Sequence, residues 1–344
     1  MKEKIYFLSE HSNHELIHGA VGLADIETIL KTMNAIPVSF PHHFNFSARA
    51  KVARLAFLIK ILFTVRQGSV IIFQHPVYAR MNRILLRLLR LRSAVRIICI
   101  VTDIDGLKSG NLHLLEHEKK FFKQHQYFIV HNENMLKWML SFHPSATCTV
   151  LGCFDFLAKN VLHRRVKSTH IIFAGNLEKS AFLEQLHTWL EVNPSLHIHL
   201  YGPYVTQAML LHPQVKYNGL HNPYTLPEML DGSFGLVWDG DGVQEPSGSL
   251  GHYMEFINHH KVSLYIVSNL PIIVHESAGS AALVKKLKLG ITVKSLFEVE
   301  QKIIDLPESE YNMMVENTYR LAKEITAGNN LKNAIKKLLI EAEG

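Results

Sequence analysis

Residues 232–271 contain the groups in this chain that are best suited to hold a diphosphate. A buried-strand pattern over residues 234–238 ends in an Asp-Gly-Asp-Gly run, and a loop of small residues follows at 247–251. Glycine and serine leave backbone N–H groups open to a phosphate, and the N-terminus of a helix adds a favourable dipole. Lys261 supplies a positive charge for the same anion. The pattern indicates the diphosphate end of an active site, and a polar loop beside a surface lysine is the alternative.

The first half of the chain alternates predicted strands with predicted helices. The strands are expected at residues 5–8, 36–38, 70–74, 95–101 and 127–130, and the first helix is expected to begin near Ala24 and Asp25. The loop after the first strand has no GxGxxG fingerprint, so we predict no dinucleotide site there. Polar side chains follow the third, fourth and fifth strands, as expected at the ligand-binding edge of a parallel sheet.

The same alternation restarts after residues 159–168, a charged stretch without apolar periodicity that predicts a linker. Strands are expected at residues 171–174, 196–201, 215–219, 234–238, 271–274 and 290–293, and helices at roughly 296–304, 309–325 and 331–342. We therefore predict an α/β fold with domains at residues 1–155 and 156–325, and a helix within 326–344 that packs back towards the first domain. The ligand cleft is expected between the two domains, at the strand ends.

The composition is that of a globular protein, with 344 residues, 47% hydrophobic and 19% charged residues, and a net charge of +6. The three cysteines form no CxxC pair, which fits a reducing cytosol better than a disulfide framework. The N-terminal apolar run is too short for a signal peptide, and residues 55–65 are too short to span a bilayer. We predict a cytoplasmic protein.

Residues 79–96 form a basic and leucine-rich segment. Its arginines at positions 80, 83, 87 and 90 share one helical face, and residues 51–66 are also basic and apolar. Such helices can lie on anionic lipid on the inner face of the cell membrane. The alternative, which we slightly favour, is that the leucines cover the sheet while the arginines face water. No aromatic residues are interleaved for base stacking, so we predict no nucleic-acid partner.

Four segments of the second half form a series that resembles a known family. They are AGNLEKSAFL at 174–183, YGPY at 201–204, GSFGLVWDG at 232–240 and NHHKVSLYIVSNLPIIV at 258–274. The series is similar to the bacterial GT-B glycosyltransferases that include β-1,6-galactofuranosyltransferases and an adhesin-glycosylating glucosyltransferase. The resemblance is strongest over residues 171–295 and extends more weakly to the first half. It implies two facing Rossmann-like domains with the active-site cleft between them.

The resemblance implies that the second domain binds a UDP sugar, without a metal ion or other cofactor. Together with the loop pattern, it gives the donor-binding candidates Gly19, Asn176, Lys179, Tyr201, Gly202, Asp239, Ser249, Gly251, Tyr253, Asn258 and Lys261. Asn258 and Lys261 are three residues apart and are expected to share a helical face. The alternative for Lys179 and Lys261 is that both are solvated surface lysines.

Transfer with inversion of the anomeric carbon needs a base that deprotonates the acceptor hydroxyl. Asp103 and Asp105 are the leading candidates for this catalytic base, with His75 and His18 behind them. A carboxylate at a strand end is often only a helix cap or a turn former, which is the alternative here. The Asp-Gly-Asp run at 239–241 has the spacing of the DxD metal motif, but such a run also suits a turn. DxD belongs to a single-domain glycosyltransferase fold, so we predict no metal site.

We therefore predict a glycosyltransferase that moves a hexosyl residue (galactofuranose, glucose or galactose) from a UDP sugar to a glycan hydroxyl. The acceptor is expected to be lipid-linked or protein-linked, in bacterial surface polysaccharide or glycoconjugate synthesis. A non-catalytic nucleotide-sugar-binding or scaffold subunit on the same fold is the alternative. A sugar-nucleotide epimerase or dehydrogenase is disfavoured by the missing GxGxxG. Peripheral contact with an anionic membrane and a homo-oligomer remain open.

Overall fold

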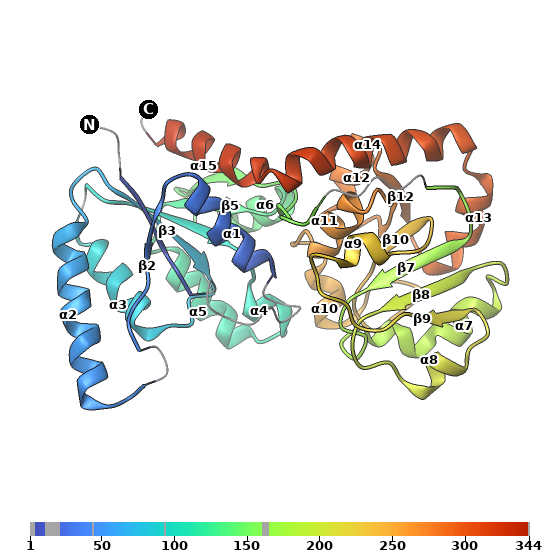
Figure 1. Ribbon diagram of the computed structural model, residues 1–344, viewed down its shortest axis with the longest axis horizontal. Coiled ribbons are helices and arrows are strands. Elements are labelled where there is room, and N and C mark those ends of the chain that lie inside the picture. The colour runs from blue at the N-terminus through green and yellow to red at the C-terminus, as the bar shows by residue number, and fades with distance from the viewer. Residues whose placement is uncertain (1–3, 11–20, 43–44, 93, 160–164, 343–344) are drawn as a thin grey trace.

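The computed structural model describes residues 4–10, 21–42, 45–92, 94–159 and 165–342. Its strands form two six-stranded sheets, and each sheet lies at the centre of one lobe of the molecule (Figure 1). Every pair of neighbouring strands in these residues is parallel. Parallel neighbours require crossover connections, and helices make most of them here, so the predicted α/β class is confirmed.

The first sheet has the strand order β2-β1-β3-β4-β5-β6. Its strands are β1 (Ile5–Leu8), β2 (Ile36–Val38), β3 (Val70–His75), β4 (Arg96–Val101), β5 (Tyr127–Val130) and β6 (Thr147–Val150). The helices between them are α1 (Val21–Thr32), α2 (Ala48–Thr64), α3 (Arg80–Leu89), α4 (Asp105–Lys108), α5 (Leu112–Phe122) and α6 (Glu133–Phe142).

The second sheet has the order β12-β11-β10-β7-β8-β9. Its strands are β7 (His170–Ala174), β8 (His197–Tyr201), β9 (Val215–Tyr217), β10 (Phe234–Val237), β11 (Ile272–His275) and β12 (Gly290–Val293). The helical segments are η1 (Ala181–Gln185), α7 (Leu186–Glu191), α8 (Gln207–Leu211), α9 (Leu226–Met229), α10 (Gly248–Tyr253), α11 (His260–Val267), α12 (Ala281–Leu287), η2 (Leu296–Glu298), α13 (Val299–Asp305), α14 (Glu308–Thr326) and α15 (Asn329–Glu341).

Both faces of each sheet are covered, because side chains along a strand point alternately to opposite faces. On β3, Ile71 and Phe73 belong to the core under α2, α3, α5 and α6. Val70 and Ile72 belong to the opposite core, under α1 and α15. This arrangement explains why the central strands read as continuous apolar runs rather than as alternating ones.

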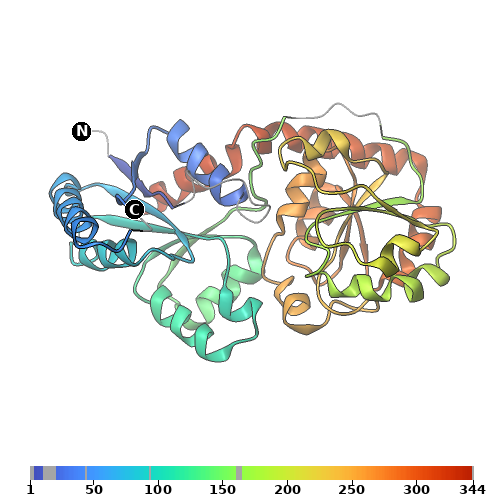
Figure 2. The same cartoon turned by 60° about the horizontal axis from the view of Figure 1, so that its bottom comes forward.

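The last two helices pass from one lobe to the other (Figures 1 and 2). α14 packs against α11 in the second lobe, and α15 packs against β5, β6 and α1 in the first. The Asp155 carboxylate accepts hydrogen bonds from the backbone N–H groups of Asn330 (3.1 Å) and Leu331 (2.7 Å), so it caps the start of α15. The domain boundary after residue 155 stays a prediction; β6 ends at Val150 and β7 begins at His170.

Three details of the predicted elements are wrong. Strand β6 was not predicted, because its sequence, TCTV, is short and half polar. The described part of α1 already begins at Val21, before the expected start. The helix expected over 296–304 is split into η2 and α13, and Ser295 caps the first of them by accepting a hydrogen bond from the N–H of Phe297.

Helix α3 resolves the two interpretations of the arginine-rich segment. Its leucines at positions 85, 86 and 89 are buried in the core of the first lobe. Its arginines at positions 80, 83, 87 and 90 are exposed. The apolar side of α3 therefore covers the sheet, as the favoured alternative states. Among the described residues, no helix combines the length and the apolar character needed to cross a bilayer.

Candidate functional site

Lys261 lies at the carboxyl ends of the strands in the second sheet. Its ammonium group is 3.8 Å from the Asp239 carboxylate, 3.5 Å from the carbonyl oxygen of Trp238 and 4.7 Å from the centre of the Phe173 ring. Its aliphatic chain crosses Gly175, where an added Cβ would lie 2.9 Å from Lys261 Cε. The side chain is only 15% exposed. A largely buried ammonium at this edge of a sheet is suited to hold an anion, and the surface-lysine alternative does not describe it.

The loops that follow β7 and β8 touch at this edge. Gly202 has a φ of +139°, and a Cβ there would lie 1.8 Å from the carbonyl oxygen of Gly175, so only glycine fits. Asn176 accepts a hydrogen bond from the N–H of Lys179 (3.2 Å) and fixes the turn between them. Lys179 itself is exposed. Four of the predicted donor-binding residues thus lie near one another: Asn176, Lys179, Gly202 and Lys261.

Tyr201, by contrast, points into the packing of the second lobe. Its hydroxyl donates to the carbonyl oxygen of Met229 (3.1 Å) and accepts from the N–H of Asp231 (3.0 Å). Burial raises its pKa, so it remains a neutral phenol. Its hydrogen bonds hold the segment after α9.

Tyr253 of α10 joins the second lobe to the first. Its hydroxyl donates to Asp103 Oδ1 (2.6 Å) and accepts from the N–H of Ile104 (2.7 Å). Burial and the Asp103 charge raise the pKa of this phenol well above its usual value. The Lys108 ammonium pairs with the other carboxylate oxygen of Asp103. A predicted donor-binding residue and the predicted base are therefore in direct contact, at the place where α10 packs against α4.

Two of the other candidate bases, Asp105 and His75, contact Glu118, a residue that the sequence analysis missed. The buried Glu118 carboxylate accepts from His75 Nε2 (3.2 Å) and from the N–H groups of Asp105 (2.9 Å) and Gly106 (2.8 Å). It caps α4 and holds the loop that carries Asp103. Burial, together with the charges of Asp103 and Glu118, raises the pKa of Asp105. Glu118 lies between Leu115 and Phe122 on the buried face of α5, and this helical spacing was the one available signal.

His75 is buried beneath the rings of Phe121 and Phe122, and its Nδ1 has no hydrogen-bond partner in the described part of the chain. Its backbone oxygen accepts hydrogen bonds from the N–H groups of Thr102 and Asp103. His75 therefore lies beneath the Asp103 loop, and Asp103 is more exposed, with a side-chain exposure of 28% against 8% for His75. The Asp103 carboxylate is therefore the more accessible of these two candidate bases.

Asn258 belongs to the contact between the lobes. Its side chain donates to the carbonyl oxygens of His131 (3.0 Å) and Gly152, and accepts from Asn132 Nδ2 (3.1 Å). The expectation that Asn258 and Lys261 share a helical face is wrong, because α11 begins at His260. Asn258 precedes α11, and its side chain instead joins this segment to the first lobe.

Ser249 and Gly251 belong to α10, which follows the Asp-Gly-Asp-Gly run. Ser249 is exposed and faces Gly110 of the first lobe, where a Cβ would lie 2.5 Å from its hydroxyl. Gly251 is buried against the backbone of Pro246. Asp241 lies beside Gly248 rather than beside Lys261. Within the described residues, no group of three or more His, Cys, Asp or Glu side chains is placed to hold a metal ion.

His259, just before α11, was not among the predicted residues. Its pKa is lowered to about 4, chiefly by burial and then by the charge of Lys261, while Asp239 and Asp103 act in the opposite direction. The charge of Lys261 and the charge of Asp103, the candidate base, therefore both affect the pKa of His259. Sequence reasoning had no means to find His259, because its importance depends on the approach of the two lobes.

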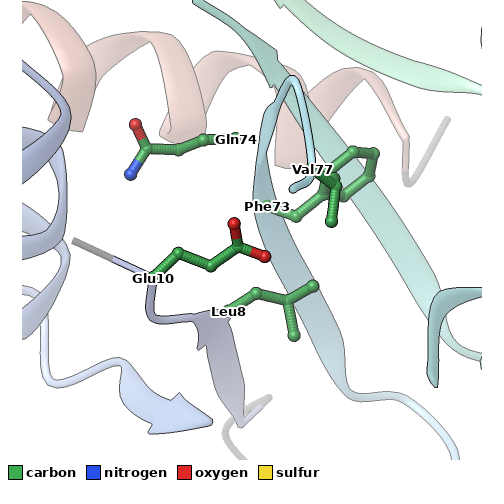
Figure 3. A pocket seen from close by; sticks show the side chains of 5 residues that line it. All are labelled: Leu8, Glu10, Phe73, Gln74 and Val77. Atoms are coloured by element: carbon green, nitrogen blue, oxygen red, sulfur yellow. The ribbon is translucent and has the colours of Figure 1, made fainter. Parts of the chain in front are cut away.

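A hollow opens at the carboxyl ends of β1 and β3 in the first lobe, and Figure 3 shows the side chains around it. It is lined by Leu8, Glu10, Phe73, Gln74 and Val77. The Glu10 carboxylate accepts hydrogen bonds from the N–H of Tyr78 (3.2 Å) and from Asn82 Nδ2 (2.5 Å), ahead of α3. Gln74 is buried, and its Oε1 has no hydrogen-bond partner in the described part of the chain. Gly19 and His18 lie outside the described residues.

Two family profiles match this chain. Residues 13–150 match the one described as "Glucosyltransferase 3-like, N-terminal domain", and residues 171–338 match "Glucosyltransferase 3-like, C-terminal domain". The chain belongs to this family. The predicted resemblance is thereby confirmed, and the two profiles divide the chain between the two sheets.

Curated relatives of this Glucosyltransferase 3-like chain are transferases. It is 27% identical over 259 residues to Beta-1,6-galactofuranosyltransferase WbbI of Escherichia coli (strain K12), and the alignment covers 71% of each chain. It is 24% identical over 324 residues to Glucosyltransferase 3 of Streptococcus gordonii, and the alignment covers 92% of each chain. The chain is a glycosyltransferase.

Solved structures share the fold. Anabaena Alr3699/HepE, solved in complex with UDP and glucose, aligns with a TM-score of 0.60 at 13% identity, over 98% of this chain and 100% of that one. WaaG, a glycosyltransferase involved in lipopolysaccharide biosynthesis, aligns with a TM-score of 0.52 at 11% identity, over 96% and 98%. These likenesses and the two parallel sheets confirm the predicted GT-B architecture.

The histidines at the junction predict how the stability of this Glucosyltransferase 3-like protein depends on pH. Burial lowers the pKa values of His131, His259 and His260 from 6.5 to about 4. Between about pH 7 and pH 5 the unfolded chain therefore binds more protons at these sites than the folded chain does, and stability falls, by about 2 kcal/mol per histidine. Asp25 and Asp155, whose pKa values are raised to about 6, offset part of this loss as they protonate in the folded state.

Urea unfolding near pH 7 and near pH 5 measures the net effect, and we expect a lower midpoint at the acidic pH. The variant His260→Asn should reduce the difference, because it removes one buried imidazole. A midpoint that is unchanged or higher near pH 5 would contradict the prediction.

Proposed function

We infer that the protein moves a hexosyl residue from a UDP sugar to a hydroxyl group of a lipid-linked or protein-linked glycan. The observation that carries this proposal is the position of the Lys261 ammonium, over Gly175 and 3.8 Å from Asp239 at the carboxyl edge of the second sheet. The donor diphosphate would bind there, with the turn at Asn176 and the exposed Lys179 beside it. The names of the relatives, which are hexosyl and galactofuranosyl transferases, support a hexosyl donor.

Asp103 is the proposed base. It would take the proton of the acceptor hydroxyl as the hydroxyl oxygen attacks the anomeric carbon. The bond between that carbon and the diphosphate oxygen breaks, and UDP leaves with the bonding electrons. The Lys261 charge would stabilise the departing diphosphate, whose negative charge grows in the transition state. Tyr253 is a positioning residue, because it holds the Asp103 carboxylate through a 2.6 Å hydrogen bond.

Several finer predictions belong to this proposal. The transfer needs no metal ion, the protein is cytoplasmic, and its acceptor side meets the inner face of an anionic membrane. The assignment of Gly19, Tyr201, Gly202, Ser249, Gly251 and Asn258 to donor binding also stays a prediction. For the last of these, the hydrogen bonds to the first lobe favour a role in joining the lobes.

Calorimetric titration with UDP, GDP, TDP and NAD tests the donor site, first in EDTA and then with Mg²⁺. We expect UDP to bind, with an affinity that EDTA does not change. Binding of NAD alone, or of no nucleotide, would contradict the proposal. Binding of UDP that strengthens greatly with Mg²⁺ would contradict metal independence only. UDP binding without turnover of any UDP hexose would favour the alternative, a non-catalytic subunit.

A further inference from the structure

Helix α2 presents an apolar surface to solvent. Val52, Leu55, Ile59 and Phe63 follow one another at intervals of three and four residues, so they lie along one face of the helix. These four side chains are 48 to 81% exposed, and Phe46, just before the helix, is 76% exposed. We call these five residues the α2 stripe. The opposite face of α2 is buried against the first sheet, so no core formed by the described residues of this lobe covers the stripe.

Basic side chains border the stripe on both sides. At about 100° per residue, Lys51 lies along one edge of the stripe, and Arg49 and Lys60 lie along the other. All three are exposed. The surrounding sequence adds to this charge, because residues 28–102 contain twelve lysines and arginines and no aspartate or glutamate. A net charge of only +6 for the whole chain means that the positive charge is concentrated in this part of the first lobe.

This combination is suited to one kind of partner. A second copy of the chain, docked stripe to stripe, would bring the same cations face to face, and like charges across an interface are costly. An anionic phospholipid surface accepts both parts of the pattern, since phosphates meet the cations while the apolar side chains enter the boundary between headgroups and acyl chains. Helix α3 cannot act in this way, because its leucines are already buried in the core.

We propose that the α2 stripe docks the protein on an anionic phospholipid bilayer. α2 lies at the end of the first lobe that is remote from the second lobe (Figures 1 and 2). Docking there leaves the junction that holds Asp103 and Tyr253 free, and it brings the first lobe next to acceptors that are anchored in lipid. The proposal does not depend on the transfer chemistry, because docking is measured without donor or acceptor.

Co-sedimentation with vesicles tests the proposal. The wild-type protein should sediment with vesicles of phosphatidylcholine that contain phosphatidylglycerol, and not with vesicles of phosphatidylcholine alone. The double variant Leu55→Gln, Phe63→Gln should lower the partition coefficient roughly tenfold or more, since two large side chains no longer leave water. Lys51→Gln with Lys60→Gln should lower it by roughly fivefold per charge, and added salt should reproduce that loss.

The matched control is Leu112→Gln with Leu211→Gln. Both leucines are as exposed as those of the stripe but lie on α5 and α8. This variant should bind the vesicles like the wild type. All six substituted side chains are exposed, so thermal unfolding and UDP affinity should remain unchanged in every variant.

Wild-type protein that ignores anionic vesicles, or an α2 double variant that binds them undiminished, would overturn the proposal. A wild-type oligomer that the stripe variant converts to a monomer, without any binding of vesicles, would also overturn it and assign the stripe to a contact between copies. Wild-type protein that binds the anionic vesicles but does not bind UDP would instead contradict the proposed function alone.

Discussion

Replacing Asp103 by asparagine should lower the rate of glycosyl transfer by roughly 10²- to 10⁴-fold, because an amide cannot take the proton of the acceptor hydroxyl. Asparagine keeps the shape of the side chain and can still accept the hydrogen bond from Tyr253, so the lobes should remain joined. The affinity for UDP should remain within about twofold of the wild-type value, because the phosphate site proposed at Lys261 is untouched.

Two further variants separate the base from its surroundings. Tyr253→Phe removes the 2.6 Å hydrogen bond to Asp103 and should lower kcat more than it changes KM, since the carboxylate loses the donor that orients it. Asp231→Asn, an exposed carboxylate of the second lobe, is the control and should transfer at the wild-type rate. Full activity of the Asp103→Asn protein would exclude Asp103 as the base and leave Asp105 or His75 as candidates.

Lys261→Ala should weaken UDP binding by roughly 1–3 kcal/mol, the cost of losing a charge-assisted hydrogen bond to phosphate. The substitution also removes the positive neighbour of the Asp239 carboxylate, and this carboxylate then repels the same phosphate. Calorimetry with UDP measures the effect, and thermal unfolding shows whether the fold is retained.

Lys285→Ala is the matched control, because Lys285 is an exposed lysine of the same lobe on α12. It should bind UDP as the wild type does. The variant Lys179→Ala distinguishes the two lysines predicted from sequence. An intermediate loss would assign Lys179 to the same anion, and no loss would leave it as the solvated lysine of the alternative. Unchanged affinity in the Lys261→Ala protein would exclude Lys261 from the site.

The sequence predicted most of the sheet strands, because buried parallel strands appear as short apolar runs that end in polar residues. β6 lacks this signal, since Thr147 and Thr149 alternate with Cys148 and Val150 at the edge of the sheet. The start of α11 was also misjudged. The run of apolar residues from Val262 suggested a helix that extends back to Asn258, whereas the side chain of Asn258 is drawn to Asn132 and His131.

The candidate site could be predicted only in part. Asp103 is marked by the strand that ends just before it, and Lys261 by the apolar run that follows it, which is local information. The hydrogen bond between Tyr253 and Asp103 joins residues that are 150 positions apart, and no local pattern contains it. Glu118 was missed for the same reason, because it acquires its partners Asp105 and Gly106 only when α5 packs against α4.

The position of α15 has a consequence for the synthesis of this chain. Leu331, Ile335 and Leu338 cover one face of the first sheet, where they meet Ile72 and Ile100. These covering residues follow β6, the last strand of the first sheet, only after all six strands of the second sheet. Until α15 has been made, the part of this face that it covers is an apolar surface of the kind that chaperones bind. The first lobe can thus reach its final packing only after the second lobe has been made.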